Sequence, residues 1–174
     1  MYRLLPLSTA VLLLAATPVF AGKAHEHGVA RLDVAVEPTR VTFLLEMPLD
    51  ALVGFEREPR SGAERAAVDA ALAKLRAPAT LFGIDSAAGC TEGKVTIESA
   101  ALGLGAAPPA KEGHADLDAS FEFNCKDGQK AGSVEVRLFD AFSRLQRVEV
   151  QAATRRGQLK ATLKRPTTRV PLAR

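Results

Sequence analysis

Residues 29–47 read VARLDVAVEPTRVTFLLEM, and this stretch decides the fold class. Apolar residues occupy alternate positions on both sides of the segment Pro38-Thr39-Arg40, with mostly charged or polar residues between them. A period of two is typical of strands that bury one face, and a short proline-containing segment between two such runs is typical of a turn. The stretch therefore predicts a β-hairpin with one face in the core.

The chain downstream of this hairpin contains a helix signal and several further strand signals. The segment Ser61-Gly62-Ala63-Glu64 is an S-x-x-E capping box, which predicts the start of a helix. Val68, Leu72 and Leu75 follow at helical spacing, and Pro78 is expected to end the helix. The other expected elements are strands around residues 94–98, 116–125, 134–138, 148–150, 159–163 and 170–172, and a short helix over 139–145.

Successive hairpins with two helices indicate an α+β domain built on antiparallel sheet. Residues 27–33 and 113–118 share a Gly-and-His opening before a strand, and each second strand is followed by a similar segment, at 48–52 and 138–142. Two β-β-α halves are one interpretation of this echo, and chance similarity is the other. Residues 103–113 are mostly Gly, Ala and Pro, which predicts a flexible loop.

The N-terminus has the three parts of a secretory signal peptide. Arg3 precedes an apolar run from Leu4 to Ala16, and Val19 and Ala21 occupy the two positions that a signal peptidase reads. The apolar run is shorter than the about 20 residues that a membrane-spanning helix needs. We therefore expect cleavage after Ala21, a periplasmic mature protein without stable membrane insertion, and a single domain over residues 22–174.

The charge of the chain argues against nucleic acid as a partner. The formal net charge is +3, and it falls to +2 when Arg3 leaves with the signal peptide. So small an excess gives little attraction to a polyanion. Basic residues are concentrated in the last third of the chain, for which a solvated sheet face and a docking surface for an acidic partner are the two interpretations.

The chain has two cysteines, Cys90 and Cys125, which lie 35 positions apart. In an exported chain, two cysteines are expected to pair as a disulfide. Closing a loop of this length stabilises the fold by about 4 kcal/mol in the chain-entropy model. The alternative, a pair of thiolate metal ligands, lacks a C-x-x-C pattern.

Three histidines are the side chains best suited to bind a ligand. His25 and His27 lie two positions apart, so in an extended segment both imidazoles project to the same side. His114 lies in a segment where strand parity places His114, Asp116 and Asp118 on the polar face. Imidazole and carboxylate ligands suit zinc, and also copper or nickel. The candidate metal ligands are His25, Glu26, His27, Glu112, His114 and Asp116, with Asp118 as a further carboxylate.

The alternative to the metal interpretation is that His25 and His27 lie on a frayed terminus and His114 is an ordinary loop residue. Separately, Phe55 lies at an apolar and acidic tip, where it either packs in the core or contacts a partner. No H-E-x-x-H, G-x-S-x-G or phosphate-binding glycine motif is present, so we expect no enzyme. A metal-dependent hydrolase that uses the three histidines is the enzymatic alternative.

Several short segments together resemble one known family. They are HEHG at 25–28, LDALVGFE at 49–56, AGC at 88–90, GHAD at 113–116, FNC at 123–125 and VRLF at 136–139. This combination resembles the ZrgA-like periplasmic zinc-binding proteins. The resemblance implies a soluble periplasmic protein that binds zinc through histidines and acidic residues and cooperates with a zinc importer.

The chain departs from the family pattern at one place. Residues 105–111 read GAAPPAK, where the family commonly has a long stretch rich in His, Asp and Glu. Asp118 also stands where a further histidine often occurs. The departure implies a lower capacity for zinc than the family has.

The expected function is that of a periplasmic zinc-binding accessory protein in zinc homeostasis, with zinc as a labile ligand. We expect reversible coordination at neutral pH that is lost as imidazoles protonate below about pH 6. A zinc importer component, or another envelope protein, is the expected protein partner. The alternative is a metal-free interaction or scaffold module that docks an envelope protein.

Overall fold

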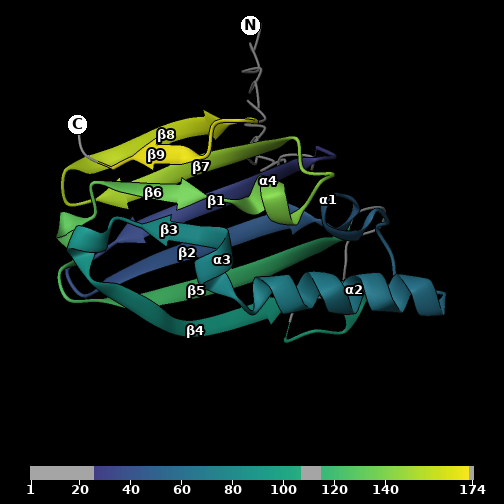
Figure 1. Cartoon of the computed structure of the whole chain (residues 1–174). Coiled ribbons are helices and arrows are strands. Elements are labelled where there is room, and N and C mark those ends of the chain that lie inside the picture. The colour runs from purple at the N-terminus through teal and green to yellow at the C-terminus, as the bar shows by residue number, and fades with distance from the viewer. Residues whose placement is uncertain (1–25, 107–114, 173–174) are drawn as a thin grey trace, which may run out of the picture.

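Two β-sheets face each other across one hydrophobic core (Figure 1). The computed structural model describes residues 26–106 and 115–172, and the larger sheet in this part of the chain has six strands. Their order is β4 (Cys90–Glu98), β5 (Asp116–Cys125), β2 (Arg40–Pro48), β1 (Val29–Val36), β7 (Arg147–Thr154) and β8 (Gly157–Leu163). The smaller sheet contains β3 (Phe82–Ile84), β6 (Ser133–Val136) and β9 (Arg169–Pro171). Only β1 and β7 pair in parallel among these strands.

The hairpin predicted over residues 29–47 is formed by β1 and β2. These strands pair antiparallel, with Leu32 opposite Leu45 and Val34 opposite Phe43. All four side chains are buried. The alternating pattern therefore decides which face of the sheet enters the core. The predicted α+β class is confirmed by the mostly antiparallel sheets and the helices between their strands.

The helices are short except for one. They are α1 (Leu49–Val53), α2 (Gly62–Leu75), α3 (Pro78–Leu81) and α4 (Leu138–Ala141), with 3-10 turns at Ser86–Ala88, Ala100–Leu102 and Gly128–Lys130. The predicted capping box is present, because the Ser61 hydroxyl accepts from the Glu64 N–H at 3.1 Å and the Glu64 carboxylate accepts from the Ser61 N–H at 3.3 Å. Pro78 lies at the start of α3. None of the described helices is long and apolar enough to cross a bilayer.

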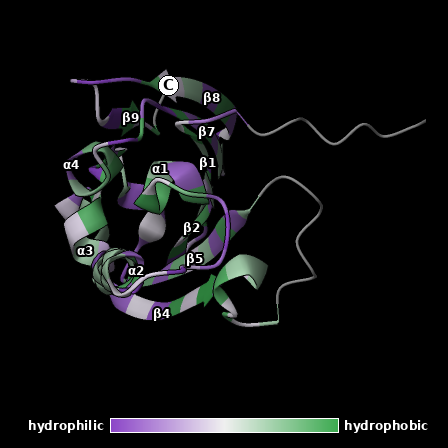
Figure 2. Ribbon diagram, turned by 90° about the vertical axis from the view of Figure 1, so that its right-hand side faces the viewer, coloured by the Kyte–Doolittle hydropathy of each residue, from purple (hydrophilic) through white to green (hydrophobic). Residues whose placement is uncertain are grey.

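Phenylalanines from both sheets fill the space between them. Phe43 of β2 stacks on Phe82 of β3, with ring centroids 4.3 Å apart. Phe121 of β5 approaches Phe82 at 5.0 Å, and Phe123 meets the Phe43 ring edge-on at 5.7 Å. In the side view, the larger sheet curves from β8 to β4, with α3 and α4 on its inner side (Figure 2). This packing joins the two sheets into one core.

The expected disulfide joins the two strands at the end of the larger sheet. Cys90 of β4 lies directly opposite Cys125 of β5, and their sulfurs are bonded at 2.06 Å. Both residues are half-buried. The bond therefore joins the first residue of β4 to the last residue of β5.

The β-β-α echo matches the structure in the order of elements but not in strand pairing. The short helices α1 and α4 do follow β2 and β6. However, β5 pairs with β4 and β2, whereas β6 pairs with β3 and β9 in the other sheet. The turn between β5 and β6 packs tightly against the turn between β1 and β2, because a Cβ on Gly128 would lie 2.3 Å from the Glu37 carbonyl oxygen. The chain thus changes sheets at this turn, and β5 and β6 do not form a hairpin.

Two predicted segments fall wholly or partly outside the described residues. The first two residues of the loop expected at 103–113 belong to a closed turn, because Ser99 and Leu104 exchange two backbone hydrogen bonds of 2.9 Å. Residues 107–113 of that loop, and the signal peptide expected at 1–21, lie outside the described residues.

Candidate metal centre

The ends of four strands, β1, β2, β5 and β7, meet at one edge of the larger sheet. Strand β1 begins where β2 ends, because Arg31 is opposite Glu46. Strand β5 begins there too, because Asp116 is opposite Pro48, and β7 begins with Arg147 opposite Val29. Side chains that precede β1 or β5, or that follow β2, are therefore brought to this edge, which we call the metal edge.

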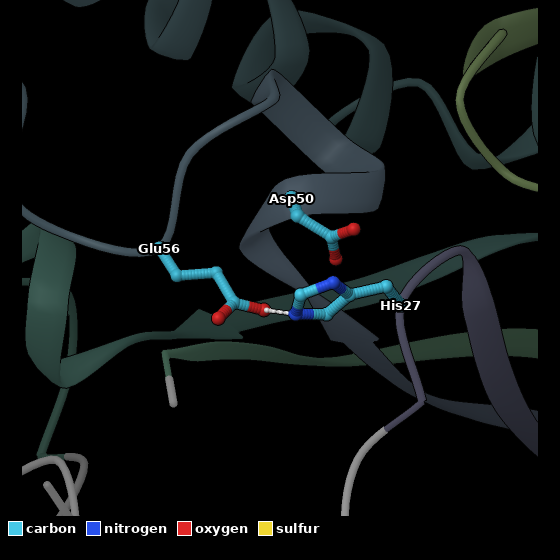
Figure 3. A group of neighbouring side chains, drawn as sticks. All are labelled: His27, Asp50 and Glu56. Atoms are coloured by element: carbon cyan, nitrogen blue, oxygen red, sulfur yellow. Dashed lines mark ion pairs between the residues drawn. The ribbon is translucent and has the colours of Figure 1, made fainter. Parts of the chain in front are cut away.

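Three potential metal ligands converge at the metal edge (Figure 3). His27 precedes β1, Asp50 lies in α1, and Glu56 follows α1. One ligand atom from each residue lies within 4.8 Å of the others. His27 Nε2 is 3.3 Å from Glu56 Oε1. One imidazole and two carboxylates form a donor set that zinc accepts in proteins.

A tight turn places His27. The Val29 N–H donates to the Glu26 carbonyl at 3.1 Å, and Gly28 adopts a φ of +71°. The Gly28 carbonyl in turn accepts from the N–H groups of Gln146 and Arg147, at 2.8 and 3.1 Å. A Cβ on Gly28 would come within 3.0 Å of the Gln146 side chain, so glycine suits this position in both its φ and its size. The start of β7 therefore holds the residue next to His27.

Helix α1 places Asp50 directly after β2. The Leu49 N–H donates to the Ala115 carbonyl at 2.8 Å, which fixes the start of the helix against the residue before β5. Leu49, Ala51 and Leu52 are buried, so hydrophobic burial fixes the orientation of the helix. Asp50 Oδ1 is buried and has no hydrogen-bond partner among the described residues. A carboxylate oxygen removed from water in this way is stabilised by a nearby cation.

The chain reverses after α1 and brings Glu56 to His27. Gly54 ends the helix with a φ of +92°, and its N–H donates to the Leu49 carbonyl at 3.2 Å. The next residue, Phe55, is half-buried against the core, as the packing alternative predicts. The Glu56 side chain is only 16% exposed, whereas the His27 side chain is 67% exposed. The cluster is therefore open to solvent on the histidine side.

An ion pair anchors the segment that carries Glu56. Arg57 donates to both carboxylate oxygens of Glu64, at 2.7 and 2.9 Å. These hydrogen bonds, together with one from the Arg60 N–H, lower the pKa of Glu64 to about 2. The segment after α1 is thus tied to the first turn of α2, where a carboxylate is also favoured by the helix dipole.

The structure separates the candidate ligands that the sequence suggested. His27 belongs to the cluster, whereas the Glu26 carboxylate accepts from Arg147 Nη2 at 2.5 Å. Asp116 begins β5 at the metal edge, and Asp118 is exposed on the outer face of the sheet. The remaining candidates, His25, Glu112 and His114, lie outside the described residues.

Sequence reasoning missed Asp50 and Glu56 as candidate ligands. Both lie in the segment LDALVGFE, which carried the family resemblance, but they are six positions apart in no recognised ligand spacing. The usable signal was positional: Asp50 follows the second strand of a hairpin, and His27 precedes the first. The two ends of an antiparallel hairpin lie side by side, so these residues had to be close.

The basic residues near the C-terminus are partly structural. Arg165 donates to the carbonyls of Leu145 and Phe139, at 2.6 and 2.9 Å. Arg169 donates to the Ser133 hydroxyl at 3.1 Å. These residues satisfy acceptors inside the fold, so the basic bias is more than a solvated face.

Comparison with known proteins gives one family. The sequence model of one protein family, described as ZrgA family zinc uptake protein, matches residues 24–172. A comparison with curated proteins gives no match. The disulfide and a role in zinc uptake together fit a protein of the cell envelope. The match covers nearly the whole chain outside the expected signal peptide, and the chain belongs to the ZrgA family of zinc uptake proteins.

Proposed function

We propose that this protein binds zinc reversibly at His27, Asp50 and Glu56 and serves as a periplasmic accessory protein in zinc acquisition. Two observations support the proposal. The first is membership of a zinc uptake family. The second, which carries the assignment of residues, is the convergence of three ligand atoms within 4.8 Å at the metal edge.

The donor set suits a cargo ion better than a permanent structural ion. Two carboxylates balance the charge of a zinc dication, and a neutral imidazole adds a nitrogen ligand. Structural zinc sites usually have four protein ligands, often cysteines, whereas three ligands leave a coordination position open. Both cysteines of this chain are held in the disulfide. An exposed histidine at an open site allows zinc to enter and leave.

Other ligands suggested by the sequence remain part of the proposal. His25 is two positions from His27, and Glu112 and His114 precede the strand that begins with Asp116 at the metal edge. We expect them to raise zinc affinity or capacity. Export by a signal peptide cleaved after Ala21, cooperation with a zinc importer and the lack of catalytic activity belong to the same proposal.

The direct test is isothermal titration of zinc into the mature protein, residues 22–174, after removal of metal by chelation. We expect saturable binding in the micromolar range or tighter. The variants His27→Ala, Asp50→Asn and Glu56→Gln should each weaken it. Loss of an outer-shell partner alone typically costs about 10–100-fold in metal affinity, so loss of a direct ligand should cost at least as much.

Matched controls keep the test specific to the cluster. Glu37→Gln removes a carboxylate at the far end of β1, and Asp69→Asn removes one from the exposed face of α2. Neither should change zinc affinity. Equal binding by the wild type and by a variant lacking all three ligands would place the site elsewhere, first at His25 and His114. No binding by the wild type would favour the metal-free interaction module.

A further inference from the structure

Arg147 contacts the residues on both sides of His27. Its backbone N–H donates to the Gly28 carbonyl at 3.1 Å, and its guanidinium Nη2 donates to Glu26 Oε2 at 2.5 Å. A second carboxylate, Glu149 of the same strand, lies 3.5 Å from Nη2. Because Arg147 is the first residue of β7, these contacts join the turn before β1 to the neighbouring strand.

The environment of Arg147 is unusual for a surface arginine. Its side chain is 25% exposed, and Nε is buried without a hydrogen-bond partner among the described residues. An arginine cannot lose its charge in a protein, so partial burial requires compensation by nearby carboxylates. Glu26 supplies the shorter of its two ion pairs. The pair is therefore shielded from solvent on the arginine side, whereas the Glu26 side chain is 65% exposed.

We propose that Arg147 is a positioning residue for zinc binding and that Glu26 is its anchor instead of a zinc ligand. This inference rests on the proposed function of His27. The pair Arg147–Glu26 and the hydrogen bonds to the Gly28 carbonyl fix the backbone before and after His27. The imidazole is then already placed opposite Asp50 and Glu56 before the ion arrives, which lowers the entropic cost of binding.

The pairing also reduces electrostatic repulsion at the site. The Arg147 guanidinium contacts the turn that carries His27, and without its ion pairs its positive charge would oppose the approach of a dication. Glu26 and Glu149 neutralise this charge locally. If Glu26 turned away to bind zinc, Arg147 would lose its shorter ion pair, and the turn would lose its anchor.

Zinc titration of four variants of the mature protein distinguishes an anchor from a ligand. In the positioning role, Glu26→Gln and Arg147→Met each weaken zinc binding, on the order of tenfold as for other outer-shell residues. Arg147→Lys, which keeps the charge, retains part of the affinity. Exchange of the two charges, in Glu26→Arg with Arg147→Glu, restores most of it. Glu37→Gln and Arg155→Met at the opposite end of the sheet serve as controls.

The opposite role predicts an opposite result. If Glu26 is itself a zinc ligand, Arg147→Met releases its carboxylate and removes a competing cation, so zinc affinity rises while Glu26→Gln lowers it. That result overturns the inference. Unchanged zinc affinity in both single variants overturns it too, because the contacts would then be structural only.

A measurement without zinc separates this inference from the proposed function. The Val29 amide donates to the Glu26 carbonyl, so its hydrogen exchange reports how often the turn opens. In the metal-free protein, Glu26→Gln and Arg147→Met should speed exchange at Val29 and leave the amides of the β2–β5 pair unchanged. Exchange at Val29 that is as slow in both variants as in the wild type contradicts the role of Glu26 as an anchor. Failure of the wild type to bind zinc contradicts the proposed function instead.

Discussion

Replacement of both cysteines by alanine tests how the larger sheet is stabilised. The Cys90–Cys125 bond closes a loop of 35 residues. In the chain-entropy model, a loop of this length removes about 13 cal/mol/K from the unfolded state, or about 4 kcal/mol at 25 °C. Both cysteines are only half-buried, so their removal should leave little cavity. The expected loss of unfolding free energy in Cys90→Ala with Cys125→Ala is therefore about 4 kcal/mol.

Urea denaturation followed by circular dichroism measures this loss, since the sequence has no tryptophan to serve as a fluorescent probe. For a domain of this size, about 2–4 °C of melting temperature corresponds to 1 kcal/mol, so the variant should melt roughly 8–16 °C lower. The disulfide lies at the opposite end of β5 from Asp116 and the metal edge, about 30 Å away at ~3.4 Å per residue. Zinc affinity of the folded variant should therefore equal that of the wild type.

Two results would refute this reasoning. A loss below about 1 kcal/mol would show that the unfolded chain is constrained without the bond, contrary to the loop-entropy argument. A fall in zinc affinity at temperatures where the variant is fully folded would show that the two ends of β5 are coupled. Circular dichroism and zinc titration of the same sample separate these outcomes.

Three further predictions follow from local contacts. Phe82→Ala removes a buried ring that stacks on Phe43, and we expect a loss of about 3–5 kcal/mol in urea denaturation. Gly28→Ala forces a Cβ into a left-handed turn and against Gln146, so melting temperature and zinc affinity should both fall. Hydrogen bonds from Arg57 lower the pKa of Glu64 to about 2, so its stabilising contribution is complete above the usual 4.5 and is lost as pH falls toward 2. Glu64→Gln should melt below the wild type at pH 7, and the two melting curves should converge between pH 5 and 2.

The elements with long periodic patterns could be predicted from the sequence. Alternation over residues 29–47 and 116–125 gave strands with the correct buried faces, and the capping box at Ser61 gave the start of α2. Strand pairing was less accessible. One interpretation of the sequence, two β-β-α halves, would place the strand after Cys125 beside β5, but the turn at Gly128 leads the chain to the other sheet. Such a change depends on packing against the Glu37 carbonyl, which no local pattern reports.

The metal edge shows a similar division between local and long-range information. His27 was a candidate because histidines are few, whereas Asp50 joins it only through the β1–β2 register and the short helix α1. Helix α1 has five residues, too few for a helical period to be recognised. The alternation of side chains along an extended segment does separate Glu26 from the two histidines. If His25 and His27 project to one side of such a segment, Glu26 projects to the other. In the structure, Glu26 indeed turns to Arg147.

The most direct test of the account is anomalous X-ray diffraction, measured at the absorption edge of zinc, from crystals of the mature protein grown with zinc. The account predicts an anomalous peak bounded by His27, Asp50 and Glu56, about 2.0–2.2 Å from one imidazole nitrogen and the carboxylate oxygens. Glu26 should remain on Arg147 in the same crystals. A fully occupied peak elsewhere on the chain, with none between these three residues, would contradict the assignment of the metal centre.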